Sequence, residues 1–274
     1  MTTRDALTRT YVGLRRLIAP DLQHCQDAYA DALRDHVHDG VRWLDLGCGH
    51  QVLPDWHAEN EKRFVGLCGT VVGIDADLES LRRHSSIQLR AQGEISLLPF
   101  RDASFDLVTA NMVVEHLENP VPSLREIARV LVPGGVCIFV TPNARGYATR
   151  LARHVPEGLK RRVIRVLDGR PPDDVFRTYY RANTDDSVRR LAETSSFDVV
   201  GISLVNSEAL FSIVPPLAAL ELLWIRLLMT EPFRQLRPDI VAILRKRHDS
   251  TPITPGLRRD SDQSSSEAFE KALE

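Results

Sequence analysis

A glycine-rich turn after an apolar run is the feature of this sequence whose residue types most directly indicate ligand binding. Residues 44–49 read LDLGCG. Gly47 and Gly49 carry no Cβ, so the backbone at the carboxyl end of a strand can approach a ligand closely. The same turn can also be only a tight connection between a strand and a helix. A second signal is needed to choose between these interpretations.

That second signal is an acidic residue after the next apolar run. Residues 71–75 read VVGID. In a doubly wound nucleoside site, a carboxylate after the second strand accepts hydrogen bonds from both ribose hydroxyls. An isolated acid after a strand is more often a solvated helix cap. Because Asp75 follows the strand after the glycine turn, the two signals support each other and favour ribose binding.

Nicotinamide dinucleotides use the same two signals, and the residues around the turn distinguish the two ligand classes. The run from Gly47 to Val52 lacks the third glycine that packs the helix near a pyrophosphate. Asp45 lies just before the turn, where a carboxylate would repel a diphosphate but would attract the ammonium group of a methionine moiety, directly or through water. These residues favour S-adenosyl-L-methionine.

Apolar runs that alternate with helix-like segments indicate how this turn is positioned. Four of them are VRWLDLG, TVVGIDAD, SFDLVTAN and GGVCIFVTPN. Strands that alternate with helices predict a parallel sheet covered on both faces, with ligands bound at the carboxyl ends of the strands. Residues 185–194 are predicted as a helix with Thr184 as its N-cap.

These blocks resemble those of the class I S-adenosylmethionine-dependent methyltransferases, in the branch that contains ubiquinone and menaquinone biosynthesis enzymes and many small-molecule and sugar methyltransferases. The resemblance covers roughly residues 41–143, including VRWLDLGCG, VVGIDAD and the block from GEISLLPF to FVTPN. It implies an α/β, Rossmann-like sheet of seven mostly parallel strands, with DIVAILRKR antiparallel beside FDVVGISLVN. His50 departs from the family pattern, in which a small residue before another glycine is common.

The resemblance also implies which residues surround the cofactor, S-adenosyl-L-methionine. Asp45 and the two glycines would surround its methionine part, and Asp75 would bind its ribose. Three further residues would lie at the adenine and two near the sulfonium, while Cys48 has no contact assigned to its side chain. The predicted cofactor-binding residues are Asp45, Gly47, Cys48, Gly49, Asp75, Ala76, Glu94, Ile95, Asn111 and Met112.

His116 is the candidate catalytic residue, because it follows the fourth apolar run, where similar enzymes face their substrate. An imidazole there could accept the proton of an attacking hydroxyl near neutral pH. The alternative is that His116 only braces the next helix. Methyl transfer from a sulfonium is already favourable, so in-line positioning can supply much of the catalysis.

The acceptor is expected beside the segment that interrupts the alternation, residues 144–183. It contains DDVFRTYYRANT, whose aromatic and hydrogen-bonding groups suit a polar small molecule, although such aromatics also pack as a small core. The predicted substrate-binding residues are Asn143, Arg177 and Tyr180. The alternative for Asn143 is a role in forming a turn.

Composition and charge restrict the class of protein. The 274 residues are 43% hydrophobic and 26% charged, with a formal net charge of −2. This is typical of one elaborated globular domain without the basic field of a nucleic-acid-binding protein. The four cysteines form no C-x-x-C pair, so we predict reduced thiols and no metal site. The N-terminus lacks a signal peptide's apolar core, which favours a cytoplasmic location.

The remaining segments complete the predicted organisation: a helical lid over residues 1–40, a methyltransferase domain over 41–248, and a disordered polar tail over 249–274. Residues 206–237 form a second insertion, apolar and helical from about Pro215 to Met229. It is too short for a confident membrane span. Three positions stay open for it: in the core, against a second subunit of a homodimer, or peripherally in a membrane interface, which Trp224 would suit.

The predicted activity is methyl transfer to a small-molecule acceptor. Oxygen is favoured over carbon or nitrogen as the methylated atom. A hydroxyl of a sugar, a glycolipid precursor or a quinone-like metabolite would fit. The alternative is a non-catalytic subunit of a larger complex that binds S-adenosylmethionine.

Overall fold

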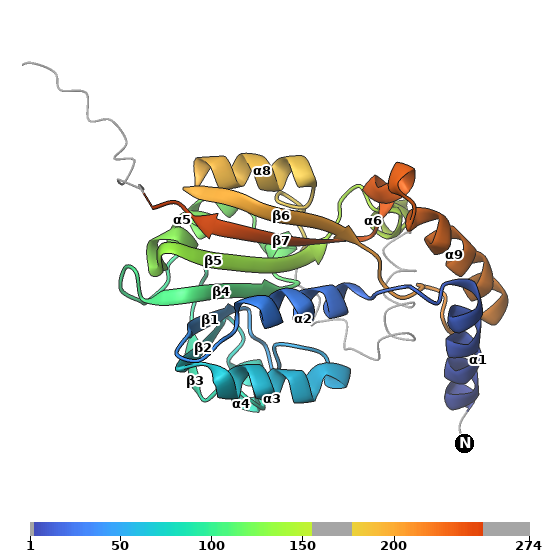
Figure 1. Ribbon diagram of the computed structural model, residues 1–274, viewed down its shortest axis with the longest axis horizontal. Coiled ribbons are helices and arrows are strands. Elements are labelled where there is room, and N and C mark those ends of the chain that lie inside the picture. Colours follow the sequence, from blue (N-terminus) through green and yellow to red (C-terminus); the bar gives the residue numbers. More distant parts are fainter. Residues whose placement is uncertain (1–2, 155–176, 249–274) are drawn as a thin grey trace, which may run out of the picture.

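A single seven-stranded sheet forms the centre of the computed structural model, which describes residues 3–154 and 177–248 (Figure 1). The strand order is β3-β2-β1-β4-β5-β7-β6. Strands β1 to β5 are parallel, and β7 is antiparallel to both β5 and β6. The predicted fold, including its antiparallel last strand, is therefore confirmed. The strands are β1 (Arg42–Leu46), β2 (Thr70–Asp75), β3 (Leu89–Gln92), β4 (Phe105–Asn111), β5 (Leu131–Pro142), β6 (Phe197–Val205) and β7 (Asp239–Lys246).

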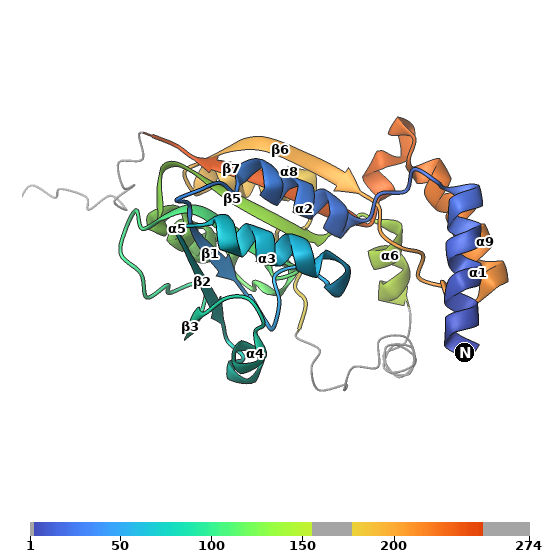
Figure 2. The ribbon, with the colours of Figure 1, turned by 60° about the horizontal axis from the view of Figure 1, so that its bottom comes forward.

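Helices cover both faces of this sheet (Figures 1 and 2). Because strand side chains alternate between faces, Trp43 and Leu44 belong to different core clusters. One cluster joins the sheet to α2 (Cys25–His36), α3 (Ala58–Leu67) and α4 (Leu78–Arg83). The other joins it to α5 (Pro120–Val130) and α8 (Asp185–Thr194).

Side-chain caps fix where several of these helices begin. Thr184 caps α8, since its hydroxyl accepts a hydrogen bond from the backbone N–H of Ser187, as the sequence predicts. His24 caps α2 through its ring, which accepts from the N–H of Gln26, while the Asp27 carboxylate accepts from the N–H of His24. The start of α2 is thereby fixed relative to β4, which matters for the site described below.

A third core cluster lies apart from the sheet, beyond the carboxyl ends of its parallel strands (Figures 1 and 2). It joins α1 (Thr3–Ile18) to α9 (Pro215–Leu228), with Tyr147 of α6 (Tyr147–His154) packed against it. The short helix η4 (Glu231–Leu236) follows α9. We call α1, α6 and α9 together the helical group.

This arrangement changes the interpretation of residues 1–40 as a single lid. The apolar side chains of α2, such as Tyr29 and Leu33, are buried against the sheet, whereas α1 packs on α9. Neither helix contributes a residue to the lining of the cavity described below. The insertion 144–183 is described only in part, because its residues 155–176 lie outside the described residues, as does the tail 249–274.

Candidate functional site

A cavity of about 730 Å³ opens at the carboxyl ends of β1, β2 and β4. Its volume is in the range of small-molecule and cofactor sites, and its position is where doubly wound sheets bind ligands. Most of the predicted cofactor-binding residues and the predicted catalytic residue line it. These are Gly47, Gly49, Asp75, Ala76, Glu94, Ile95, Asn111, Met112 and His116.

The glycine turn is shaped by backbone conformation and by close packing. Gly47 and Gly49 have φ of +61° and +53°, in the left-handed region that favours glycine. A Cβ on Gly47 would lie 2.4 Å from Cγ2 of Val113, whereas nothing lies within 4 Å of one on Gly49. Gly47 is therefore required by the fold itself.

The carboxylate of Asp75 is held in a fixed orientation at this turn. Its Oδ2 accepts the N–H of Gly49 and its Oδ1 accepts the N–H of Asp77, both at 2.8 Å. A carboxylate has about four acceptor positions, so two bonds leave capacity for a vicinal pair of hydroxyls. The geometry fits the predicted role in ribose binding.

Asp45 occupies a different place from the one predicted. Its side chain is 1% exposed, lies on the face of β1 that also carries Trp43, and is absent from the cavity lining. The hydroxyl of Thr109 donates to it and in turn accepts Nε1–H of Trp43 at 2.6 Å. Burial raises the pKa of Asp45 to about 8. This corrects Asp45 from a cavity residue to a buried acid behind the glycine turn.

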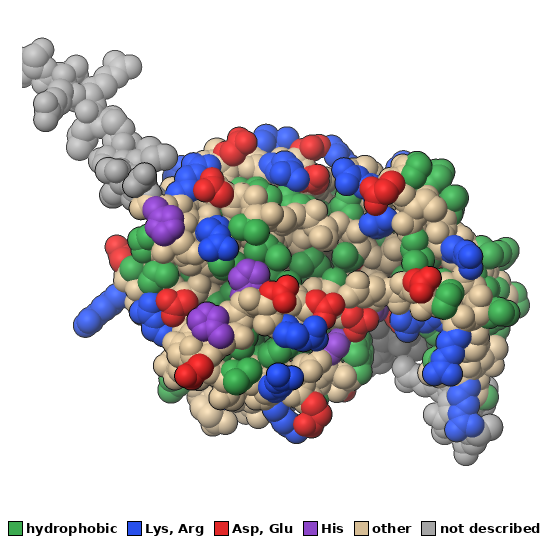
Figure 3. All heavy atoms as spheres, in the orientation of Figure 1, with side chains coloured by type: hydrophobic (Ala, Val, Ile, Leu, Met, Phe, Trp, Pro, Cys, Tyr) green, Lys and Arg blue, Asp and Glu red, His purple; other side chains and the backbone are tan. Residues whose placement is uncertain are grey.

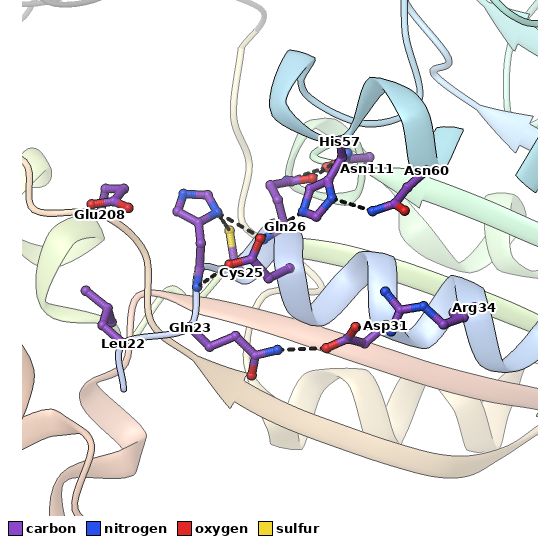
Figure 4. A network of polar contacts seen from close by, with 12 residues as sticks. Leu22, Gln23, Cys25, Gln26, Asp31, Arg34, His57, Asn60, Asn111 and Glu208 are labelled. Atoms are coloured by element: carbon purple, nitrogen blue, oxygen red, sulfur yellow. Dashed lines mark hydrogen bonds and ion pairs between the residues drawn. The ribbon is translucent and has the colours of Figure 1, made fainter. Parts of the chain in front are cut away.

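Asn111 is fixed by a residue that sequence reasoning missed, Gln26 of α2 (Figure 4). The two amides exchange hydrogen bonds of 2.8 and 2.9 Å, and Nδ2 of Asn111 also donates to the carbonyl of Val52 at 2.8 Å. The next residue, Met112, has a φ of +54°, a strained conformation for a side chain of this type. Contacts with Gln26 and Val52 therefore hold the end of β4 in one conformation.

Two acids, one of them buried, anchor the segment from Val52 to His57. Glu61 of α3 is 3% exposed and accepts the N–H groups of both Val52 and Leu53. Asp27 of α2 accepts Nε2–H of His57, at 2.8 Å. The segment after His50 is thus ordered and joined to α2 (Figure 4).

His116 faces the cavity with a defined tautomer. Its Nδ1 lies 3.0 Å from the carbonyl oxygen of Arg177, and a carbonyl can only accept, so Nδ1 carries the proton. In the neutral imidazole Nε2 is then the acceptor nitrogen. It lies 3.9 Å from Oε1 of Glu115, a buried carboxyl that also accepts the hydroxyl of Thr141. Burial raises the pKa of Glu115.

The predicted substrate-binding residues lie outside the cavity lining, and Tyr179 lines it instead. Asn143 is 1% exposed and donates to the carbonyls of Gln235 and Arg237, so it joins the end of β5 to the chain around η4. Tyr180, with a φ of +53°, lies under the guanidinium of Arg153. Arg177 is exposed and lies over the ring of Tyr179. These three predictions are corrected accordingly.

Cys48, to whose side chain no cofactor contact is assigned, is absent from the cavity lining. Its side chain is 1% exposed and lies so close to Gly73 that a Cβ there would be 2.6 Å from its Sγ. Burial raises the pKa of its thiol. Within residues 3–154 and 177–248, no group of His, Cys, Asp and Glu side chains could hold a metal ion.

Comparison with known proteins agrees with this geometry. Residues 44–139 match the family described as "Methyltransferase domain". The chain is 39% identical over 143 residues to a demethylmenaquinone methyltransferase of Mycobacterium sp. (strain KMS), covering 51% of this chain and 59% of that protein. It is 34% identical over 122 residues to a ubiquinone biosynthesis O-methyltransferase of Paracidovorax citrulli, covering 41% and 48%. The chain thus spans about half the length of these curated relatives.

A solved structure supports the fold over a longer stretch. The S-adenosylmethionine-dependent methyltransferase from Mesorhizobium loti superposes with a TM-score of 0.53 at 18% identity, covering 81% of this chain and 97% of that one. S-adenosyl-L-methionine is the cofactor that this family and this fold imply. Residues 44–139 thus match the methyltransferase domain family, and the strand order shows that the sheet has the fold of the S-adenosylmethionine-dependent methyltransferases.

Proposed function

We propose that this chain transfers a methyl group from S-adenosyl-L-methionine to a hydroxyl of a small-molecule acceptor. The observation that carries the proposal is that one cavity has an oriented carboxylate, Asp75, and an imidazole with an acceptor nitrogen, His116. The first suits a ribose and the second suits a hydroxyl proton. An oxygen acceptor is also supported by the relative named a ubiquinone biosynthesis O-methyltransferase.

The chain's own residues would hold the cofactor along the carboxyl edge of the sheet. Asp75 would accept the ribose hydroxyls, Glu94 and Ile95 would contact the adenine, and Asn111 and Met112 would contact the part near the sulfonium. When bound, the cofactor supplies an electrophilic methyl group. Asp45, buried behind the turn, would act on the ammonium group only through water.

His116 would remove the proton from the acceptor. Its Nε2 accepts the hydroxyl proton as the oxygen attacks, and the Arg177 carbonyl keeps the other ring nitrogen protonated. When ionised, the nearby Glu115 carboxylate favours the resulting imidazolium. The ring of Tyr179 on the same cavity could hold the body of the acceptor, as a sugar, glycolipid or quinone head group would require.

The test combines binding with label transfer. Wild-type protein should bind S-adenosylhomocysteine in calorimetry and transfer a tritiated methyl group to a component of a cell extract. His116→Gln should bind as well as wild type but transfer label roughly 100-fold more slowly, the usual contribution of a general base. If wild type binds and transfers no label to any extract, the proposal is wrong and the non-catalytic subunit is favoured.

We also propose a cytoplasmic location. All four cysteines, Cys25, Cys48, Cys68 and Cys137, are free thiols, and three of them are buried. Reduced thiols are typical of the cytosol, whereas secreted proteins usually pair them. Mass spectrometry of alkylated protein from intact cells would detect any disulfide and thereby contradict this assignment.

A further inference from the structure

One face of α9 is packed and the opposite face is apolar but exposed. Ala218, Leu222, Ile225 and Leu228 are fully buried. Facing outward are Leu217, Leu220, Leu223 and Leu227, whose exposed fractions are 44%, 65%, 55% and 39%. With Phe211 and Val214, each 40% exposed just before the helix, they form what we call the α9 outer face. A helix that is apolar all round is normally covered on both sides.

The helical group around this face carries more arginines than acids, although the whole chain has a net charge of −2 and Arg15 of α1 is paired with Glu208 at 2.8 Å. From Ala6 onward α1 has three arginines and no acid, α6 has two arginines, and α9 has one. The acid of α9, Glu221, is buried and accepts the hydroxyl of Tyr147. Figure 3 shows basic side chains along α1 and hydrophobic ones at the adjoining edge of the molecule, where α9 lies.

The helical group also lies on the functional side of the molecule. It is at the carboxyl edge of the parallel strands, where the cavity opens (Figure 2). Asn143, at the end of β5, connects this edge to η4 by two hydrogen bonds. A partner surface bound to the α9 outer face would therefore lie near the entrance through which an acceptor reaches the cavity.

We propose that the α9 outer face docks the protein on an anionic lipid bilayer. The exposed leucines and Phe211 enter the interface between headgroups and acyl chains, and the arginines of the helical group meet the lipid phosphates. Since none of the described helices is long and apolar enough to cross a membrane, the contact is peripheral. The acceptor is then a lipid-borne molecule, and this last step rests on the proposed methyl transfer.

A second copy of the chain is the competing occupant, and charge argues against it. A two-fold contact through the α9 outer face would bring the same patch of both copies together. Two helical groups that each carry more arginines than acids would then approach each other, which is unfavourable. An anionic bilayer supplies the opposite charge together with an apolar layer.

Sedimentation with vesicles tests the docking. Full-length wild type is mixed with vesicles of phosphatidylcholine alone and with vesicles that also contain phosphatidylglycerol. We expect sedimentation with the anionic vesicles that weakens as salt is added. Leu220→Gln/Leu223→Gln should reduce the partition coefficient roughly tenfold or more. Arg16→Gln, at an exposed position, should reduce it about fivefold, since each basic residue near such a surface contributes about 1 kcal/mol.

The matched control replaces exposed apolar residues of two edge strands, Leu89→Gln/Val200→Gln. Their exposed fractions, 56% and 52%, are similar, but they lie on the sheet away from α9. We expect this control to sediment like wild type. Equal loss in both double variants, or no sedimentation of wild type with either vesicle, would contradict the docking.

Light scattering on the protein without vesicles tests whether a second copy of the chain occupies the α9 outer face instead of a bilayer. The proposal is overturned if wild type does not sediment with vesicles and is a dimer that Leu220→Gln/Leu223→Gln converts to a monomer. The α9 outer face would then be assigned to a second copy. Calorimetry with S-adenosylhomocysteine should be unchanged in every variant, because none of these residues lines the cavity. Failure of docking and failure of the proposed methyl transfer are therefore distinguishable.

Discussion

The edge of the sheet that carries the cavity and the helical group beside it are built on different principles. At the edge, functional groups are held by polar contacts: Gly49 fixes Asp75, and Gln26 fixes Asn111. The helical group is held by apolar packing of α1 on α9, and its outer leucines have no fixed partner. The first region is organised to bind a small polar molecule in one orientation. The second presents a surface that suits an extended, fluid partner.

The largest effect expected at the edge comes from Gly47→Val. The new side chain would need a left-handed φ and would overlap Val113, so both stability and binding of S-adenosylhomocysteine should be lost, with a cost of roughly 3 kcal/mol or more. Gly49→Ala is the matched control, because it has the same kind of φ but open space around the added Cβ. It should cost only about 1 to 2 kcal/mol. Equal melting temperatures for the two variants would contradict the packing argument.

A smaller effect is expected from Asp45→Asn, and it depends on pH. Burial raises the pKa of Asp45 to about 8, so the folded chain keeps a proton that the unfolded chain loses near the ordinary value of 3.8. The free energy of unfolding therefore falls as pH rises from about 4 to 8. Asparagine cannot ionise, so the stability of the variant should rise relative to wild type as the pH increases across this range.

Melting curves of wild type and Asp45→Asn, recorded at intervals from pH 5 to pH 8, measure this difference in stability. Parallel curves would mean that Asp45 is ionised in the folded chain. In the same variant, binding of S-adenosylmethionine should weaken if Asp45 acts on the ammonium group through water. An unchanged affinity would remove Asp45 from the cofactor site.

The smallest effect is expected from Gln26→Leu, which removes the support of Asn111 without touching the cavity. Loss of the amide pair should weaken S-adenosylhomocysteine binding by about 1 kcal/mol, roughly fivefold. Gln23→Leu is the control, since Gln23 makes an exposed hydrogen bond to Asp31 and has no link to β4. If both variants bind equally well, Asn111 needs no support from α2.

The same contrast explains what the sequence could predict. The glycine turn and Asp75 follow local signals, because the carboxyl ends of neighbouring parallel strands meet at one edge, whereas Asn111 and His116 follow from the family resemblance. Gln26 carries no such signal, since its partner is 85 residues away. The family resemblance also supplied the antiparallel last strand, which periodicity alone does not orient.

The predicted site residues that lie outside the cavity lining are there for physical reasons. Asp45 was assigned from its distance to the turn along the chain, but strand alternation turns it toward the face beneath α2. Asn143 meets carbonyls from a segment more than ninety residues later in the chain. At Tyr180 the left-handed φ turns the chain, so Tyr179 is the residue that reaches the cavity. Contacts of this kind exist only in the folded chain.

Calorimetric titration with S-adenosylhomocysteine, on wild type and on Asp75→Ala, tests the central claim most directly. We expect one site per chain in wild type and an affinity roughly 30- to 100-fold lower in the variant, because two hydrogen bonds to the ribose are lost. Asp106→Ala is the control: its carboxylate also accepts a backbone N–H and pairs with Arg42, but it lies away from the cavity lining. Its affinity should equal that of wild type. No binding by wild type, or equal affinity in Asp75→Ala, would contradict the assignment of this cavity to S-adenosylmethionine.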